Sequence, residues 1–120
     1  MNEEIYIKKY EVSTMMKKDL REARIEIIVT TMNETGKISD GESLRVWIKG
    51  KNTLDEPIEI VLTEHLYIKE VSENRLSAPL YNPVIWTEKN PYNYEGKLEL
   101  IDSDGRVKEE HKFEVTVLND

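Results

Sequence analysis

Apolar and polar residues alternate along most of this chain. Between residues 44 and 51, for example, the apolar residues Leu44, Val46 and Ile48 occupy every second position. Successive side chains of a strand point to opposite faces, so a period of two predicts half-buried strands. By this criterion we expect strands near residues 5–12, 24–32, 44–51, 58–62, 66–71, 97–101 and 107–117, with brief pairing at 84–86. In the last strand we expect one shared face for Val107, His111, Phe113, Val115 and Val117.

Turn-forming residues separate these strands. Residues 33–43 contain two glycines and several polar turn formers, and residues 72–75 form a polar tip. Residues 79–93 contain three prolines, which lack the N–H that a long strand needs. The Asp104-Gly105 pair suits the turn of a closing hairpin. For residues 13–22 two interpretations stay open: a short helix with Ser13 as N-cap, or a segment that crosses between sheets.

Seven or eight short strands in 120 residues predict a single domain over residues 1–120. The expected fold is an all-β, two-sheet antiparallel sandwich with at most one short N-terminal helix. Residues 44–60 resemble the second-strand pattern of immunoglobulin-like and fibronectin-type modules, and residues 94–115 resemble their final hairpin. The layout is also similar to the cytosolic bacterial intracellular proteinase inhibitor family, although that family usually carries an aromatic residue where this chain has Leu98. The sandwich itself implies no particular function.

Composition excludes several classes of protein. Alanine occurs only at Ala23 and Ala78, which argues against a helical bundle. No apolar run is longer than that of residues 27–29, which is too short to cross a membrane, and the absence of cysteine excludes disulfides. A net charge of −7 has the wrong sign for a nucleic-acid-binding protein. Abundant Lys and Glu without Gln is a thermophile signal, but an AT-rich viral or mobile-element genome would give a similar bias.

No catalytic or metal-binding motif stands out. The only histidines are His65 and His111, and His111 falls on the apolar side of its strand, which favours a structural role. There is no nucleophile elbow, phosphate loop or paired-histidine zinc spacing. Residues 102–105 resemble a fragment of a calcium loop, but the loop numbering would place Leu100 at a ligand position. We therefore expect no catalysis, no cofactor and no metal.

Trp47 is the first candidate for binding. We expect it on the outer side of its strand, between Arg45 and Lys49. Trp, Tyr and Arg dominate the hot spots of protein interfaces, so these three residues form a candidate contact surface. The alternative is that the N-terminal strand covers Trp47 or that Arg45 stacks on it.

The segment from Tyr81 to Tyr94 is the second candidate. It combines tyrosine, tryptophan, asparagine and proline, and binding loops favour Tyr and Asn because they give contact area at low entropic cost. Within it we expect Tyr81, Trp86 and Tyr92 to contact a partner and Tyr94 to be structural. The alternative is a sandwich corner, in which the hydroxyl of Tyr92 or Tyr94 binds the backbone.

Together these features predict a non-catalytic module that binds another protein. We expect it in the cytoplasm, as a monomer or small homo-oligomer, without nucleic acid or membrane contact. Two alternatives stay open. One is an inhibitor of a cytosolic protease, which rests on the second resemblance, and the other is a structural subunit of a virion or filament, which exposed edge strands would allow.

Overall fold

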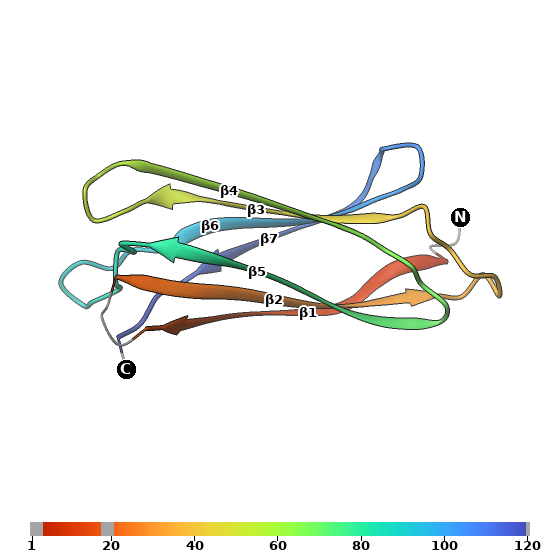
Figure 1. The fold of residues 1–120 in the computed structure, drawn as a ribbon, viewed down its shortest axis with the longest axis horizontal. Helices are drawn as coiled ribbons and strands as arrows, with labels where there is room; N and C mark the ends of the chain where they lie inside the picture. Colours follow the sequence, from red (N-terminus) through yellow and green to blue (C-terminus); the bar gives the residue numbers. More distant parts are fainter. Residues whose placement is uncertain (1–3, 18–20, 120) are drawn as a thin grey trace.

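The computed structural model describes residues 4–17 and 21–119. These residues form seven strands (Figure 1): β1 (Ile5–Met16), β2 (Glu22–Asn33), β3 (Ser43–Lys51), β4 (Pro57–His65), β5 (Val71–Tyr81), β6 (Tyr94–Ile101) and β7 (Val107–Val115). They contain no helix, and therefore none that is long and apolar enough to cross a membrane.

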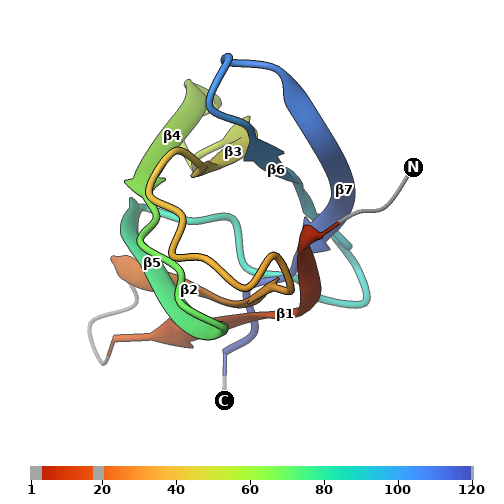
Figure 2. The same cartoon turned by 90° about the vertical axis from the view of Figure 1, so that its right-hand side faces the viewer.

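The strands are divided between two antiparallel sheets. One sheet has the order β1-β2-β5 and the other has the order β4-β3-β6-β7. Seen from one end, the sheets lie face to face as two layers (Figure 2). This arrangement confirms the predicted all-β sandwich.

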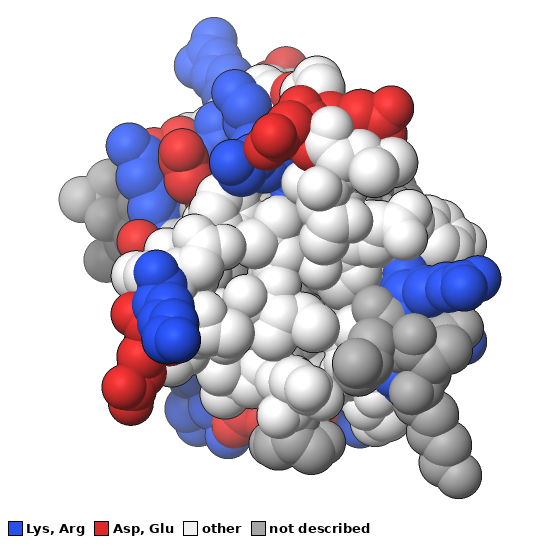
Figure 3. Space-filling view, turned by 90° about the vertical axis from the view of Figure 1, so that its left-hand side faces the viewer, with Lys and Arg blue, Asp and Glu red and all other residues white. Residues whose placement is uncertain are grey.

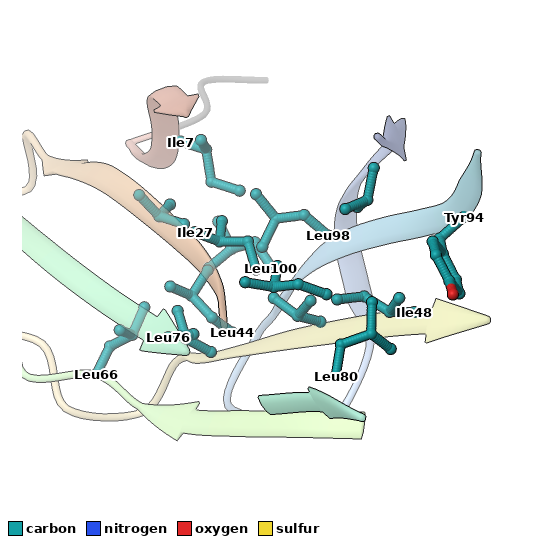
Figure 4. Packing of buried hydrophobic residues seen from close by; sticks show 14 of the residues in the cluster. Ile7, Ile27, Leu44, Ile48, Leu66, Leu76, Leu80, Tyr94, Leu98 and Leu100 are labelled. Carbon is teal, nitrogen blue, oxygen red and sulfur yellow. The ribbon is translucent and has the colours of Figure 1, made fainter. Parts of the chain in front are cut away.

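The core lies between the two inner faces (Figure 4). Ile25, Ile27 and Val29 of β2 are fully buried against Leu44, Val46 and Ile48 of β3 and Leu98 and Leu100 of β6. Each trio occupies alternate positions of its strand, as the sequence pattern predicts. Burial of such side chains contributes roughly 1.5–3 kcal/mol each, so these buried rows of β2, β3 and β6 make a large contribution to the free energy of folding.

Neither the helix nor the crossing between sheets considered for residues 13–22 is formed, because β1 and β2 are neighbours in one sheet. Ser13–Met16 are the end of β1 and pair with residues 23–26 of β2, while residues 18–20 lie outside the described part of the chain. Val12, Thr14 and Met16 have half-buried side chains at alternate positions, which is the pattern of a strand. The long partner strand β2 supplies backbone partners up to Met16, and this pairing outweighs the preference of Ser13 for a helix N-cap.

The strand predicted at residues 66–71 and the polar tip predicted at residues 72–75 are also wrong, because β5 begins at Val71 and continues to Tyr81. Ser72 and Asn74 are half-buried on the side that buries Leu76, so polar inward residues hide the alternation at this end. Pro79 lies within the strand, which is tolerated because β5 is an edge strand that pairs only with β2.

Two smaller predictions fail for local reasons. A register shift at the β6–β7 hairpin pairs Leu100 with Glu109 but Ile101 with Val107, so Val107 turns outward and is 45% exposed. Residues 84–86 form no strand. In this segment Val84 is buried, and the backbone N–H of Trp86 donates to the carbonyl of Val117 at 2.8 Å.

The predicted turn at residues 102–105 is confirmed. The Asp102 carboxylate accepts hydrogen bonds from the backbone N–H groups of Asp104 and Arg106, both at 2.9 Å, and Gly105 has a φ of 82°. The bond from Arg106, and then that from Asp104, hold the pKa of Asp102 below its ordinary value of 3.8. The Asp102 carboxylate therefore stabilises the turn in which it lies.

Candidate functional site

The segment between β5 and β6 crosses one end of the sandwich, the left-hand end in Figure 1. Three backbone hydrogen bonds of 2.7–2.9 Å fasten it there: Asn82 to Arg21, Thr53 to Asn82, and Trp86 to Val117. These bonds join it to the β1–β2 turn, the β3–β4 turn and the residues after β7. The segment is therefore a fixed part of the fold.

Tyr94 is the corner tyrosine of this end. Its side chain is fully buried, and its hydroxyl donates to the carbonyl of Lys51 at 2.7 Å and accepts from the N–H of Val84 at 2.8 Å. Burial is the main cause that raises its pKa above 10.0. The structural role predicted for Tyr94 is confirmed.

Tyr92 shares this corner. Its hydroxyl accepts a hydrogen bond from the N–H of Lys51 at 2.8 Å, and its ring packs edge-on against Tyr94 with centroids 5.0 Å apart. Tyr92 also lines a hollow of about 450 Å³ together with Lys49. The hydroxyl is thus engaged in the fold, while a contact of its ring with a partner stays a prediction.

Around this corner lies a broad uncharged surface, ringed by charged side chains (Figure 3). We define the end surface as Leu54, Tyr81, Ile85 and Trp86. Leu54 is 68% exposed, Tyr81 is 60% exposed, and the other two are half-buried. Leu54 and Tyr81 are exposed large hydrophobic side chains within this uncharged surface, and exposed apolar side chains that lie together are typical of a contact surface. Trp86 is not buried between the sheets and stays a candidate anchor.

The second candidate surface lies on the outer face of the four-stranded sheet. Trp47 is half-buried there, and its indole N–H donates to a Glu59 carboxylate oxygen at 2.6 Å. Two ammonium groups lie over the Trp47 indole, that of Lys97 at 4.6 Å and that of Lys49 at 5.6 Å from a ring centroid. Lysines from two strands therefore surround the indole, in place of the cover by the N-terminal strand or by Arg45 that we considered.

Arg45 is engaged elsewhere on this face. Its guanidinium binds one oxygen of Glu99 at 2.7 Å from Nε and 2.6 Å from a terminal nitrogen. Glu99 is only 5% exposed, so Arg45 neutralises a buried carboxylate. This structural role was not visible in the sequence, because Arg45 and Glu99 become neighbours only through the β3–β6 register.

The structure thus separates the six predicted residues into two groups. Trp47, Arg45 and Lys49 share the outer sheet face, whereas Tyr81, Trp86 and Tyr92 lie in the segment at the end of the sandwich. Sequence reasoning missed Lys97 and Lys112, which the β6–β7 register places directly opposite each other. Their alternation with inward-facing residues in each strand predicts that they face outward. The sequence does not specify the β6–β7 register, so it could not show that the two lysines are neighbours.

The two histidines do not form a common site. His65 is exposed at the end of β4, whereas His111 is half-buried on β7 and lies 2.9 Å from a Glu109 oxygen. Its ring packs against Tyr10 of β1 at a centroid distance of 5.4 Å, which fits a role in closing the edge between the sheets. Within residues 4–17 and 21–119, no cluster of three or more acidic or histidine side chains could hold a metal ion.

Comparison with known protein families shows to which family this chain belongs. The profile of glycosyl hydrolases family 2 matches residues 5–116, which is nearly the whole chain. The chain belongs to glycosyl hydrolases family 2. A search of curated proteins gave no match to this family 2 chain.

Solved structures of much larger proteins contain a similar sandwich. The β-glucuronidase of Parabacteroides merdae superposes with a TM-score of 0.67 at 13% identity, covering 95% of this chain and 14% of that protein. The β-glucuronidase of Bacteroides uniformis gives a TM-score of 0.69 at 15% identity, covering 90% of this chain and 13% of that protein. The exo-chitosanase of Amycolatopsis orientalis gives a TM-score of 0.59 at 16% identity, covering 95% of this chain and 13% of that protein. At these identities the likeness establishes the fold alone.

The family match corrects the functional prediction. A non-catalytic protein-binding module, with a protease inhibitor or an assembly subunit as alternatives, is wrong, because the chain belongs to a family of hydrolases. The prediction that the chain is not an enzyme is corrected by the same match, and the resemblance to the proteinase inhibitor family is not supported. These errors share one physical cause. Alternating strands and turn residues specify a sandwich, and many unrelated proteins use the same scaffold.

Proposed function

We propose that this chain serves as a sandwich domain of a glycoside hydrolase that cleaves β-linked sugars, with the catalytic carboxylates in another part of the enzyme. The observation that carries the proposal is the family 2 match over residues 5–116. Similar solved structures named β-glucuronidase and exo-chitosanase support the proposal. This chain spans only 13–14% of the length of those proteins. Most of such an enzyme therefore lies outside a unit of this size.

The chemistry of glycoside hydrolysis supports a catalytic site elsewhere. The reaction uses two carboxyl groups that flank the bond, one of which has a raised pKa and acts as the general acid. The pKa of Asp102 is lowered, which is the opposite of what an acid catalyst needs. Glu99 is buried, and its oxygens lie 2.6 Å from Arg45 and 3.7 Å from Lys97, so they face cations within the fold.

The end surface is the region best suited to pack against the rest of that enzyme. It presents Leu54 and Tyr81, which are more than half exposed, on a rigid corner built around Tyr94. Apolar side chains on a fixed backbone lose little conformational entropy on binding and gain from removal from water. The protein partner predicted from the sequence becomes, in this proposal, the catalytic part of the same enzyme.

This proposal predicts where β-glycosidase activity is found. An antibody raised against the purified chain should remove most activity toward p-nitrophenyl β-glucuronide or β-glucosaminide from an extract of the source cells. The purified 120-residue chain should show no turnover of either substrate. The same antibody saturated beforehand with purified chain is the control and should leave the activity in the extract. Activity that remains after complete removal of the chain would contradict the proposal, as would turnover by the chain alone.

A further inference from the structure

The two long sides of the sandwich are closed to different extents. Figure 2 shows β7 above β1 on one side and β4 above β5 on the other. On the first side, the Glu109 carboxylate accepts a hydrogen bond from the N–H of Ile7 at 2.9 Å. The Lys108 ammonium group donates to the carbonyl of Ile5 at 3.0 Å. On the second side no hydrogen bond or ion pair joins β4 to β5, both of which are described in full.

Two hollows lie along this second side, each lined by residues of both strands. One measures about 290 Å³ and is lined by Ile58, Ile60 and Leu80 among others. The other measures about 270 Å³, and its lining includes Leu62 and Leu76. The inward row of β4 is only half-buried, whereas the inward row of the neighbouring β3 is fully buried. The side between β4 and β5 therefore has space for apolar side chains of a further segment.

The free edge of β4 differs from the other three free edges. Sheet edges are commonly protected by lysine, proline or a bulge. β1 has a register shift between Ile7 and Lys9, β5 contains Pro79, and β7 carries Lys108 and Lys112. β4 pairs with β3 over nine residues without a register shift, contains no lysine and has proline only at its first position. In the described parts of the chain, its backbone has no hydrogen bond apart from this pairing.

Charge specifies the strand that fits this edge. Residues 52–68 contain four carboxylates and no lysine or arginine. Two of these carboxylates belong to β4: Glu59 accepts the indole N–H of Trp47, whereas Glu64 forms no ion pair with any described residue. A second copy of β4 would place another acidic strand beside this edge, and like charges across a ladder are destabilising. A segment in which lysine or arginine alternates with apolar residues has the complementary charge.

We propose that an extended basic segment from the rest of the enzyme adds to β4 as a fifth strand of this sheet. Its backbone pairs with the free N–H and carbonyl groups of β4, its inward side chains enter the two hollows, and a lysine or arginine contacts Glu64. The origin of the segment rests on the proposed function, whereas strand addition rests on the edge and the hollows. Tyr81 lines the first hollow and belongs to the end surface, so the two contacts are continuous.

Hydrogen–deuterium exchange resolved to single amides tests this proposal. It compares the isolated chain with the form captured from source cells through an affinity tag encoded in its gene. In an antiparallel strand, about half of the N–H groups face away from a given neighbour. Those on the free edge of β4 should exchange about tenfold more slowly in the captured form, the scale of one added hydrogen bond. The N–H groups on the free edge of β7 are the internal control and should slow much less.

Two pairs of variants locate the contact. Val61→Lys places a charge in the middle of the β4 edge and should return the exchange of β4 to that of the isolated chain. Its matched control is Val71→Lys on β5, since the two valines are 54% and 60% exposed, and this control should keep the protection. Glu64→Gln should speed exchange by about twofold to fivefold, the scale of one exposed charge pair. Glu114→Gln at an exposed position of β7 should have no effect on β4. Circular dichroism of the isolated variants checks that each one folds.

Each arm can overturn a distinct part of the proposal. Unchanged exchange of β4 in the captured form, or equal slowing at the edge of β7, would overturn strand addition. Protection of β4 that appears in the isolated chain as its concentration rises would assign the edge to a second copy and overturn the assigned partner. An unaltered rate in Glu64→Gln would overturn the basic character of the segment. A captured form without β-glycosidase activity would contradict the proposed function alone, because the exchange of β4 is measured in either case.

Discussion

Replacement of Tyr94 by phenylalanine is expected to lower the free energy of unfolding by about 2–3 kcal/mol. The variant keeps the buried ring but removes the hydroxyl that donates to the Lys51 carbonyl and accepts from the Val84 N–H. The N–H of Val84 then loses its partner in a buried position, and an unsatisfied buried polar group is more destabilising than a hydrogen bond is stabilising. Urea unfolding followed by circular dichroism measures the change.

Tyr81→Phe is the matched control for this prediction. Tyr81 lies on the same segment but is 60% exposed, so its hydroxyl can remain hydrated. The control should change the free energy of unfolding by less than about 0.5 kcal/mol, the usual range for surface substitutions. Equal stability of the Tyr94→Phe and Tyr81→Phe variants would show that the corner does not hold the end of the sandwich.

Gly50→Ala is expected to destabilise the fold by about 3 kcal/mol, at the upper end of the range for overpacked cores. A Cβ atom at Gly50 would lie 2.3 Å from a ring carbon of Tyr94 and 2.7 Å from the hydroxyl of Tyr92. Both hydroxyls are hydrogen-bonded to the backbone of Lys51, so neither ring can move away without loss of a bond. Thermal and urea unfolding of the purified variant test this prediction.

A double-mutant cycle separates this steric effect from the intrinsic preference of the strand. Alanine suits a strand at least as well as glycine does, so the destabilisation by Gly50→Ala arises from the close contacts, of which the ring of Tyr94 makes the shortest. In a Tyr94→Ala background, where that ring is absent, Gly50→Ala should cost much less. An equally large loss in both backgrounds would place the cause in the Tyr92 hydroxyl or the backbone of β3, and would contradict the argument that the Tyr94 ring is the main obstacle.

The fold was predictable because its core rows are regular. Ile25, Ile27 and Val29 alternate without interruption, and the structure buries all three. The errors occur where tertiary context decides the outcome. The inward face of β5 begins with Ser72 and Asn74, which have no apolar signal, and the strand continues through Pro79 only because it lies at a sheet edge.

The candidate sites were only half predictable from the sequence. Aromatic composition identified Trp47 and the segment from Tyr81 to Tyr94, and the corner role of Tyr94 followed from its place before a strand. The lysines around Trp47 could not be assigned, because Lys97 is 50 residues away in sequence and reaches the indole only through the β3–β6 register. Pairing across a sheet depends on register, and an alternating sequence does not specify it.

The central claim is that the end surface packs against the rest of a glycoside hydrolase. Hydroxyl-radical labelling of the isolated chain and of the enzyme captured from source cells tests it directly. Tyr81 and Tyr67 are 60% and 59% exposed, but Tyr67 lies between β4 and β5 at the opposite end of the sandwich (Figure 1). We expect the labelling of Tyr81 to fall severalfold in the captured enzyme while that of Tyr67 stays the same. Unchanged labelling of Tyr81, or a loss confined to Tyr67, would contradict the claim.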